Sequence, residues 1–223
     1  MTRRWLALGA VCLAIALVLI GPGMLRNLEF FRVRRVEVLG ARYLSGAQVM
    51  AALRLDADQS LFDGTAPLAR RVFGILGVRE AKVTRRWPGT LVVRVAEWEP
   101  VALTPADAGL ALLDVRGRVL PFDPTRSPAD LPLAPADPVV ARLMARLRDA
   151  EPEVYADVQT ARRVGDHVIL EAGARRYLLR HEATVEELNA LAAVAADLAR
   201  KGRTWRELDA RFAERILVRG MRS

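Results

Sequence analysis

The sequence is poor in the side chains that build disulfides and metal sites. It contains one cysteine, Cys12, and two histidines, His167 and His181. A single thiol excludes an intramolecular disulfide, and so few thiol and imidazole ligands argue against a structural zinc site. Lysine is also scarce, with only Lys82 and Lys201, so arginine carries the net charge of +8.

The sequence also lacks the motifs of the common enzyme classes. It has no GxxxxGK[ST], GxGxxG or HExxH segment. His167 lies in a strand-like run and His181 precedes a helix cap, and neither has a nucleophile and an orienting group in its company. Glu97 and Glu99 are predicted to share the solvent-facing side of a strand. We therefore expect no catalysis, no cofactor and no small-molecule substrate.

Aromatic residues make up only 6% of the chain. They are not interleaved with the arginine pairs, such as Arg85 and Arg86, as a base-stacking platform requires. The basic excess is therefore interpreted as a solvated surface, and we expect no nucleic-acid ligand.

One long uncharged segment runs from Trp5 to Leu25. Its 21 residues, at about 1.5 Å per residue, match the thickness of a hydrocarbon core of about 30 Å. Gly21-Pro22-Gly23 interrupts it, which leaves a shorter run like that of a signal peptide, but no small-x-small cleavage site follows. We predict a transmembrane helix over 5–25. Flanking charge does not set its orientation, and the greater length after the helix favours a cytoplasmic tail over 1–4 and an exported remainder.

The segment 31–101 has the pattern strand, helix, helix, strand, strand. The strands are expected over 31–39, 78–87 and 90–101, the last two joined at a Pro-Gly turn. Ser45 and Gln48 have the spacing of a capping box, so the first helix is expected to begin at Ser45. The second is predicted to use the apolar side chains Leu68, Val72, Phe73, Ile75 and Leu76, and Gly77 is placed to end it.

The segment 102–223 is predicted to be rich in strands, with two helices. Proline is dense from 121 to 138, which predicts an irregular surface loop. Thr184 and Glu187 form a second capping-box pattern at the start of the longer helix. The expected elements are a hairpin over 110–121, a helix over 139–149, strands over 158–163, 167–171 and 175–180, a helix over 184–200, and strands over 206–212 and 215–219.

The first of these segments resembles the polypeptide-transport-associated (POTRA) domain of the FtsQ/DivIB family of bacterial cell-division proteins. The similarity is carried by FxVxxVxVxG from Phe31, WPGTLxVxVxE from Trp87, and EPVA from Glu99. LDxxGxVL from Leu113 and LDARF from Leu208 are similar to parts of the family's second, β-rich domain. The resemblance implies an α+β fold with a transmembrane helix, a βααββ POTRA domain over 31–101 and a β domain over 102–223.

The resemblance further implies a non-catalytic scaffold of the division machinery. Such a protein lies in the inner membrane at the septum, with its C-terminal part in the periplasm. The family's last strands bind FtsB/FtsL-type proteins, while its POTRA domain makes other divisome contacts. Carried over by position, the expected partner-binding residues are Phe212, Glu214, Arg215, Ile216, Leu217 and Val218, with Arg162 and Arg163 on a neighbouring strand as an acid-binding pair.

Two other functions are compatible with parts of this pattern. A POTRA-type chaperone module in export or outer-membrane assembly usually comes with repeated POTRA units or a following barrel, and neither is predicted. A secreted hydrolase or receptor is disfavoured because no catalytic constellation is found.

Overall fold

The computed structural model describes residues 31–220, apart from 108, 127–129 and 213–214. The predicted anchor over 5–25 and tail over 1–4 lie outside these residues. In the described part of the chain, no helix is long and apolar enough to cross a membrane. The chain divides into two compact units between Glu97 and Trp98.

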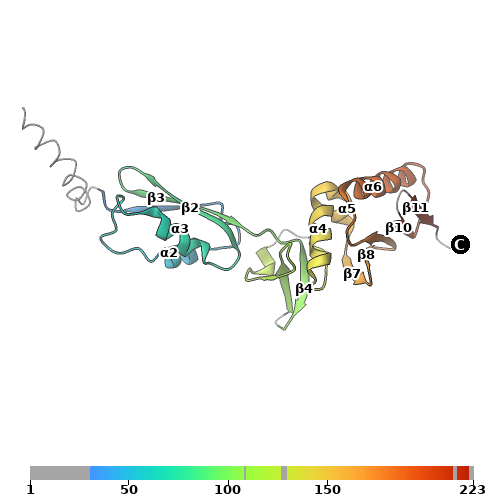
Figure 1. The fold of residues 1–223 in the computed structure, drawn as a ribbon, viewed down its shortest axis with the longest axis horizontal. Helices are drawn as coiled ribbons and strands as arrows, with labels where there is room; N and C mark the ends of the chain where they lie inside the picture. Colours follow the sequence, from blue (N-terminus) through green and yellow to red (C-terminus); the bar gives the residue numbers. More distant parts are fainter. Residues whose placement is uncertain (1–30, 108, 127–129, 213–214, 221–223) are drawn as a thin grey trace, which may run out of the picture. The chain divides into compact units, whose positions relative to one another are not determined.

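The first unit is a three-stranded sheet with two helices on one side (Figure 1). In chain order its elements are β1 (Arg35–Leu39), α2 (Gly46–Leu53), α3 (Thr65–Phe73), β2 (Val78–Arg86) and β3 (Thr90–Glu97). The strand order is β1-β3-β2, with β1 parallel and β2 antiparallel to the central β3. This confirms the POTRA-type α+β fold predicted for this segment.

Capping chemistry fixes the start of α2. Ser45 accepts a hydrogen bond from the backbone N–H of Gln48, and the Gln48 side chain accepts one from the backbone N–H of Ser45. Such reciprocal bonds satisfy two donors that a helix start leaves without an intrahelical partner. The predicted capping box is confirmed.

The end of α3 differs from the prediction. The helix ends at Phe73, and its last carbonyls receive the backbone N–H of Gly74 rather than being closed by Gly77. Only Leu68 and Val72 are buried on α3, while Phe73 and Leu76 are exposed. The apolar residues after Val72 continue the helical spacing although the sheet does not bury them, so the predicted helix was too long.

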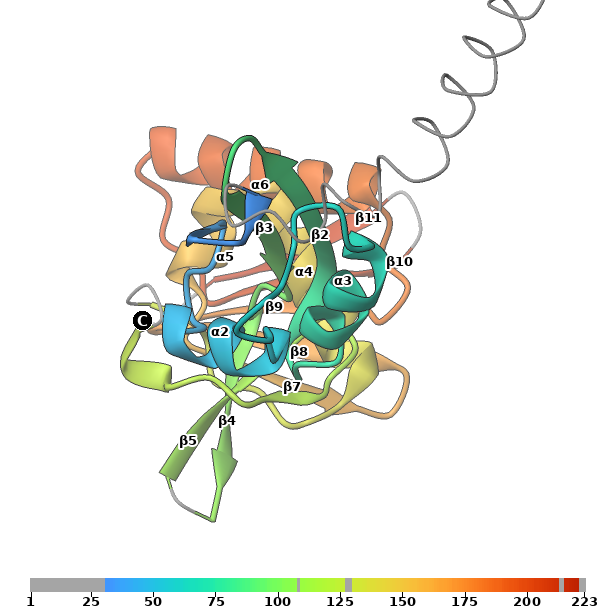
Figure 2. The same ribbon diagram turned by 90° about the vertical axis from the view of Figure 1, so that its left-hand side faces the viewer.

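The second unit contains the remaining strands and helices (Figure 2). They are β4 (Ala102–Ala106), β5 (Gly109–Leu113), β6 (Val119–Leu120), the 3₁₀ helix η2 (Pro124–Arg126), α4 (Pro138–Ala150), α5 (Pro152–Asp157), β7 (Thr160–Val164), β8 (His167–Ala172), β9 (Arg175–Arg180), α6 (Val185–Arg200), β10 (Glu207–Phe212) and β11 (Arg215–Arg219). The short helix α5 was not predicted, because six residues give too little periodicity to recognise.

Two ladders of strands make up the second unit, in the orders β4-β5-β6 and β11-β10-β9-β8-β7. Leu133 joins them, since it forms parallel bridges with Leu103 of β4 and Thr160 of β7. The proline-rich segment was predicted to be wholly irregular, and that was wrong at this point. Pro132 and Pro135 flank the bridge, and the N–H groups of Leu133 and Ala134 supply the donors that proline lacks.

The core of the second unit lies between the five-stranded ladder and the helices. Alternate residues of the strands, including Leu170, Leu179 and Leu208, are fully buried against residues of α4 and α6 such as Leu143 and Leu191. The other alternate residues of the same strands lie on the opposite, helix-free face of the sheet.

Candidate protein-interaction site

The last strand, β11, is at one end of the five-stranded ladder. It pairs antiparallel with β10, and no other strand among the described residues pairs with it. An edge strand of this kind presents N–H and C=O groups that are free to pair with another chain. The open edge of β11 is the first element of the candidate site.

Exposed apolar side chains accompany this edge. Phe212 at the end of β10 is 51% exposed, and Leu217 and Val218 on β11 are 43% and 46% exposed. Ile216, by contrast, is partly buried and packs against the core. Glu214 lies outside the described residues. The predicted site residues at the end of the chain therefore combine one side chain that anchors β11 with three that are available to a partner.

The helix-free face continues from Leu217 across the sheet. Leu217 pairs with Asp209 of β10, Asp209 with Leu178 of β9, and Leu178 with Ile169 of β8. Paired residues share a face of a sheet, so these side chains form one cross-strand row. This row is apolar except for Asp209, whose side chain is fully buried.

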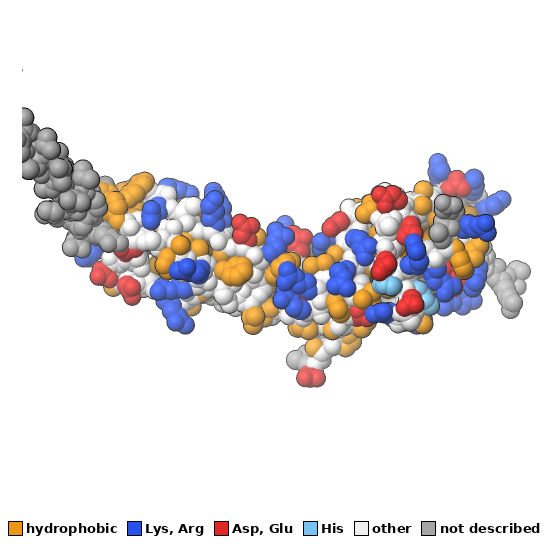
Figure 3. Space-filling model, in the orientation of Figure 1, with side chains coloured by type: hydrophobic (Ala, Val, Ile, Leu, Met, Phe, Trp, Pro, Cys, Tyr) orange, Lys and Arg blue, Asp and Glu red, His pale blue; other side chains and the backbone are white. Residues whose placement is uncertain are grey.

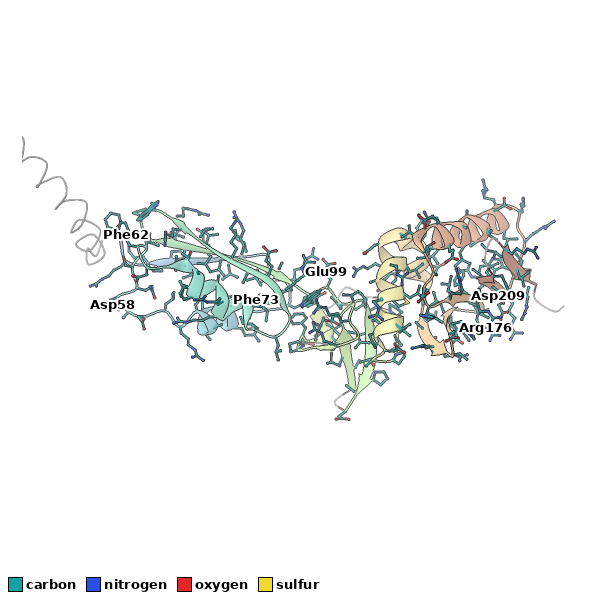
Figure 4. The ribbon with its side chains drawn as sticks, in the orientation of Figure 1. Asp58, Phe62, Phe73, Glu99, Arg176 and Asp209 are labelled. Carbon is teal, nitrogen blue, oxygen red and sulfur yellow. The ribbon has the colours of Figure 1, made fainter. Side chains whose placement is uncertain are left out.

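Asp209 is held by Arg211 two residues later. The Arg211 Nε and Nη2 donate to Oδ1 and Oδ2 of Asp209 at 2.8 and 2.7 Å, and the Arg211 backbone N–H donates to Oδ1 at 3.2 Å. The hydrogen bond from the Arg211 side chain is the main cause that keeps the pKa of Asp209 below its ordinary value. Figure 4 shows Asp209 and Arg176 in this part of the sheet.

The Asp209–Arg211 pair spans an irregularity in the β10–β11 hairpin. Asp209 pairs with Leu217 and Phe212 with Arg215, so β10 has one more residue than β11 between these pairs. Such a bulge turns the strand and redirects the side chains that follow it. Phe212 comes directly after Arg211, at the end of this bulge.

A second ion pair closes the other end of the hairpin. Arg219 Nη1 lies 2.9 Å from Glu207 Oε1 across the β10–β11 register. The Glu207 side chain is only 11% exposed, so this pair is partly shielded from solvent. This pair joins β11 to β10, whereas the Asp209–Arg211 pair lies within β10.

Arg162 and Arg163 are not beside the last strand, and the expectation that they lie on a neighbouring strand was wrong. They belong to β7, at the other end of the five-stranded ladder, with three strands between it and β11. The five strands pair in sequence order, and the parallel pairing of β10 with β9 extends the sheet away from β7. Arg163 lies 3.8 Å from Asp137, and Arg162 lies 4.0 Å from Glu171.

Glu97 also differs from its prediction as a solvent-facing residue. It is buried at the end of β3, and its carboxylate accepts the backbone N–H groups of Arg42, Tyr43 and Leu44 at 3.1, 2.9 and 2.9 Å. Glu99 lies beyond the strand and is exposed. The two carboxylates thus have separate surroundings, and Glu97 fixes the loop after β1.

Sequence reasoning missed Asp209, Arg211, Glu207 and Arg219 as members of the site. Asp209 and Arg211 were visible in the LDARF segment, which was used only to align the last hairpin. Glu207 and Arg219 carried no signal, because their pairing depends on the register of β10 and β11.

Known proteins similar to this chain are division proteins. Residues 31–98 match the family model described as POTRA domain, FtsQ-type. The cell division protein FtsQ of Rhodothermus marinus is 33% identical over 219 residues, which cover 86% of this chain and 79% of that protein. The chain belongs to the FtsQ family of cell division proteins. This confirms the family resemblance found in the sequence.

Other similar proteins match shorter parts of the chain. FtsQ of Zymomonas mobilis is 34% identical over 106 residues, covering 46% of this chain and 33% of that protein. The solved extracytoplasmic domain of DivIB from Geobacillus stearothermophilus has a TM-score of 0.35 and 21% identity, covering 47% of this chain and 97% of that domain. Membership of the FtsQ family supports the expected role as a cell-division scaffold, and a chaperone role in export or outer-membrane assembly is not favoured.

Proposed function

We propose that this protein is a non-catalytic, single-pass scaffold that binds other division proteins through the open edge of β11. In this proposal residues 5–25 cross the inner membrane, residues 1–4 are cytoplasmic, and the POTRA domain over 31–101 and the β domain over 102–223 lie in the periplasm at the septum. The observation that carries it is an edge strand with exposed apolar side chains in a member of the FtsQ family.

Strand addition explains why the site combines a free backbone edge with apolar and charged side chains. The partner's main chain pairs with β11, and its alternate side chains meet Leu217 on one face and Val218 on the other. The helix-free face also offers more cations than anions, which favours an acidic partner segment. Its charged residues are Arg162, Arg176, Arg180, Arg211, Arg215 and Arg219 against Glu171, Glu207 and Asp209.

We expect an FtsB/FtsL-type protein to occupy this edge. Arg162 and Arg163, on β7, are a separate prediction for an acidic residue of a partner, because a strand added to β11 runs along the opposite end of the ladder. Charge reversal at Arg162 is therefore expected to weaken binding less than changes in β11.

Two single proline substitutions test strand addition. Successive N–H groups of a strand point to opposite sides, so one of Ile216→Pro and Leu217→Pro removes an N–H from the free edge and the other removes one from the β10 pairing. The variant that removes an N–H from the free edge is expected to abolish co-purification with the partner while its unfolding in urea is unchanged. The variant that removes an N–H from the β10 pairing is expected to destabilise the hairpin as well.

Proline in β7 provides the matched control. Val164→Pro disturbs a strand of the same ladder far from β11 and is expected to leave co-purification intact when the protein is folded. Full co-purification by both folded β11 variants would contradict strand addition. Depletion of the protein tests the division role separately, since filamentous cells are expected, whereas normal division with an outer-membrane assembly defect would favour the chaperone role.

A further inference from the structure

Three aromatic rings gather at one end of the first unit. The Phe31 ring centroid lies 5.0 Å from that of Phe62 and 5.6 Å from that of Trp87, and Phe62 and Trp87 are 5.2 Å apart. We name these three residues the aromatic tip. Figure 4 shows Phe62 at the end of the first unit where the described chain begins, near Asp58.

Backbone hydrogen bonds hold the three parts of the tip together. Leu61 donates to the Phe31 carbonyl and Val33 to the Gln59 carbonyl, which ties the loop before α3 to the first described residues. Arg34 and Arg35 donate to the Gly89 carbonyl, which ties the β2–β3 turn to the same segment. The tip is therefore a preformed surface, built where the chain enters the first unit.

Ring packing accounts for only part of this aromatic surface. Trp87 stays 52% exposed although it touches both phenylalanines, and an exposed indole of this size is typical of a surface that meets an apolar or interfacial environment. Tryptophan in particular is enriched at the membrane–water interface, where its apolar ring and its N–H are both satisfied.

Exposed arginines surround the tip. Arg34 precedes β1, Arg35 is its first residue, and Arg85 and Arg86 precede Trp87. Arg86 forms an ion pair with Glu37. Arg85 donates to the Asp63 backbone carbonyl, which is uncharged, so this contact does not neutralise the Arg85 charge. Figure 3 shows apolar and basic side chains at this end of the first unit, with acidic side chains beside them. Cations beside interfacial aromatics favour an anionic lipid surface.

The length of the chain before the tip keeps it near the membrane. The predicted anchor ends at Leu25, six residues before Phe31. Six residues span at most about 20 Å when fully extended. This short tether gives the tip a high effective concentration at the bilayer. The other exposed surfaces of the first unit are farther from the anchor along the chain.

We propose that the aromatic tip inserts into the headgroup region of the anionic phospholipid bilayer that residues 5–25 cross. The inference rests on the proposed membrane anchor. Its consequence is that the POTRA domain is seated on the membrane surface by Trp87 and its flanking arginines, in addition to the covalent link to the anchor.

Site-specific fluorescence in nanodiscs tests the proposal with the full chain. In a Cys12→Ser background, Trp87→Cys is labelled with bimane and placed in discs of phosphatidylglycerol and phosphatidylcholine whose acyl chains are brominated near the headgroup. Strong quenching is expected at position 87, about fivefold weaker at the matched control Phe73→Cys. Phe73 is equally exposed, at 57%, but lies on α3 outside the tip.

Asp58→Cys gives a second position that leaves all three aromatic residues in place, so its label reports on the tip with the aromatic cluster intact. Its quenching is expected to fall between the two other positions and to weaken when Arg35 is changed to Gln. Equal, weak quenching at positions 87, 58 and 73 in protein that has entered the discs would overturn the proposal. So would bimane fluorescence at position 87 that changes when a partner protein is added but not when the lipid is present. Failure to enter the discs would instead contradict the proposed anchor.

Discussion

Removal of the Asp209 carboxylate is expected to loosen the partner-binding hairpin. Asp209→Ala deletes three hydrogen bonds to Arg211 and leaves a guanidinium without its carboxylate. Breaking a buried ion pair from one side costs about 3–5 kcal/mol, but the Arg211 side chain is 31% exposed and regains water. We therefore expect the free energy of unfolding of the second unit to fall by about 2–3 kcal/mol.

Urea unfolding of the full chain in nanodiscs measures this loss, and hydrogen exchange locates it. Faster exchange is expected in Phe212 and β11, because the Asp209–Arg211 pair spans the bulge before them. Asp197→Ala is the matched control, since Asp197 accepts from Lys201 at an exposed helix end. Because this pair is exposed to solvent it contributes little to stability, so equal losses for the two variants would refute the reasoning.

The same pair gives a pH dependence with a definite sign. Because the pKa of Asp209 is lowered in the folded protein, its stabilising contribution is complete above the ordinary value of 3.8 and is lost as the pH falls through the lowered value. Unfolding below pH 4 is expected to be less steep in Asp209→Asn than in the wild type. An identical acid titration of the two proteins would contradict this assignment.

Three further substitutions test the contacts that hold each unit. Glu97→Ala leaves three backbone N–H groups without their carboxylate and is expected to destabilise the first unit by about 3 kcal/mol in urea unfolding. Tyr155→Phe removes the hydrogen bond of 2.9 Å to the Val101 carbonyl, at a cost of about 1 kcal/mol. Because burial raises the pKa of Tyr155 to about 12, the wild type is expected to lose stability between pH 10 and 12, and this variant is expected to lose less. Gly117→Ala places a Cβ 2.7 Å from the Pro138 nitrogen at a φ of 71°, and is expected to lower the midpoint of thermal unfolding measured by circular dichroism, by several degrees. No change in the matching transition would contradict each of these three expectations.

Local chemistry made most of the elements predictable. The capping boxes at Ser45 and Thr184 and the Pro-Gly turn before β3 act within a few residues, so their consequences are readable in the sequence. The βααββ order of the first unit follows from them. The end of α3 was misplaced because Leu76 continues the apolar pattern without being buried.

Long-range pairing accounts for the features that the sequence did not reveal. The bridge through Leu133 depends on two strands that are far apart in the chain. The position of β7 relative to β11 depends on the parallel return of β10 to β9. Nothing in a single sequence sets these registers, so the edge at β11 was found by family resemblance, while the separation of Arg162 from it was not foreseen.

Hydrogen exchange of the full chain with and without a co-purified FtsB/FtsL-type partner tests the central claim most directly. Strand addition predicts that the partner slows exchange of the N–H groups on the free edge of β11, while β8, in the interior of the same ladder, exchanges at an unchanged rate. Unchanged exchange throughout β11 in a complex that remains assembled would contradict the account.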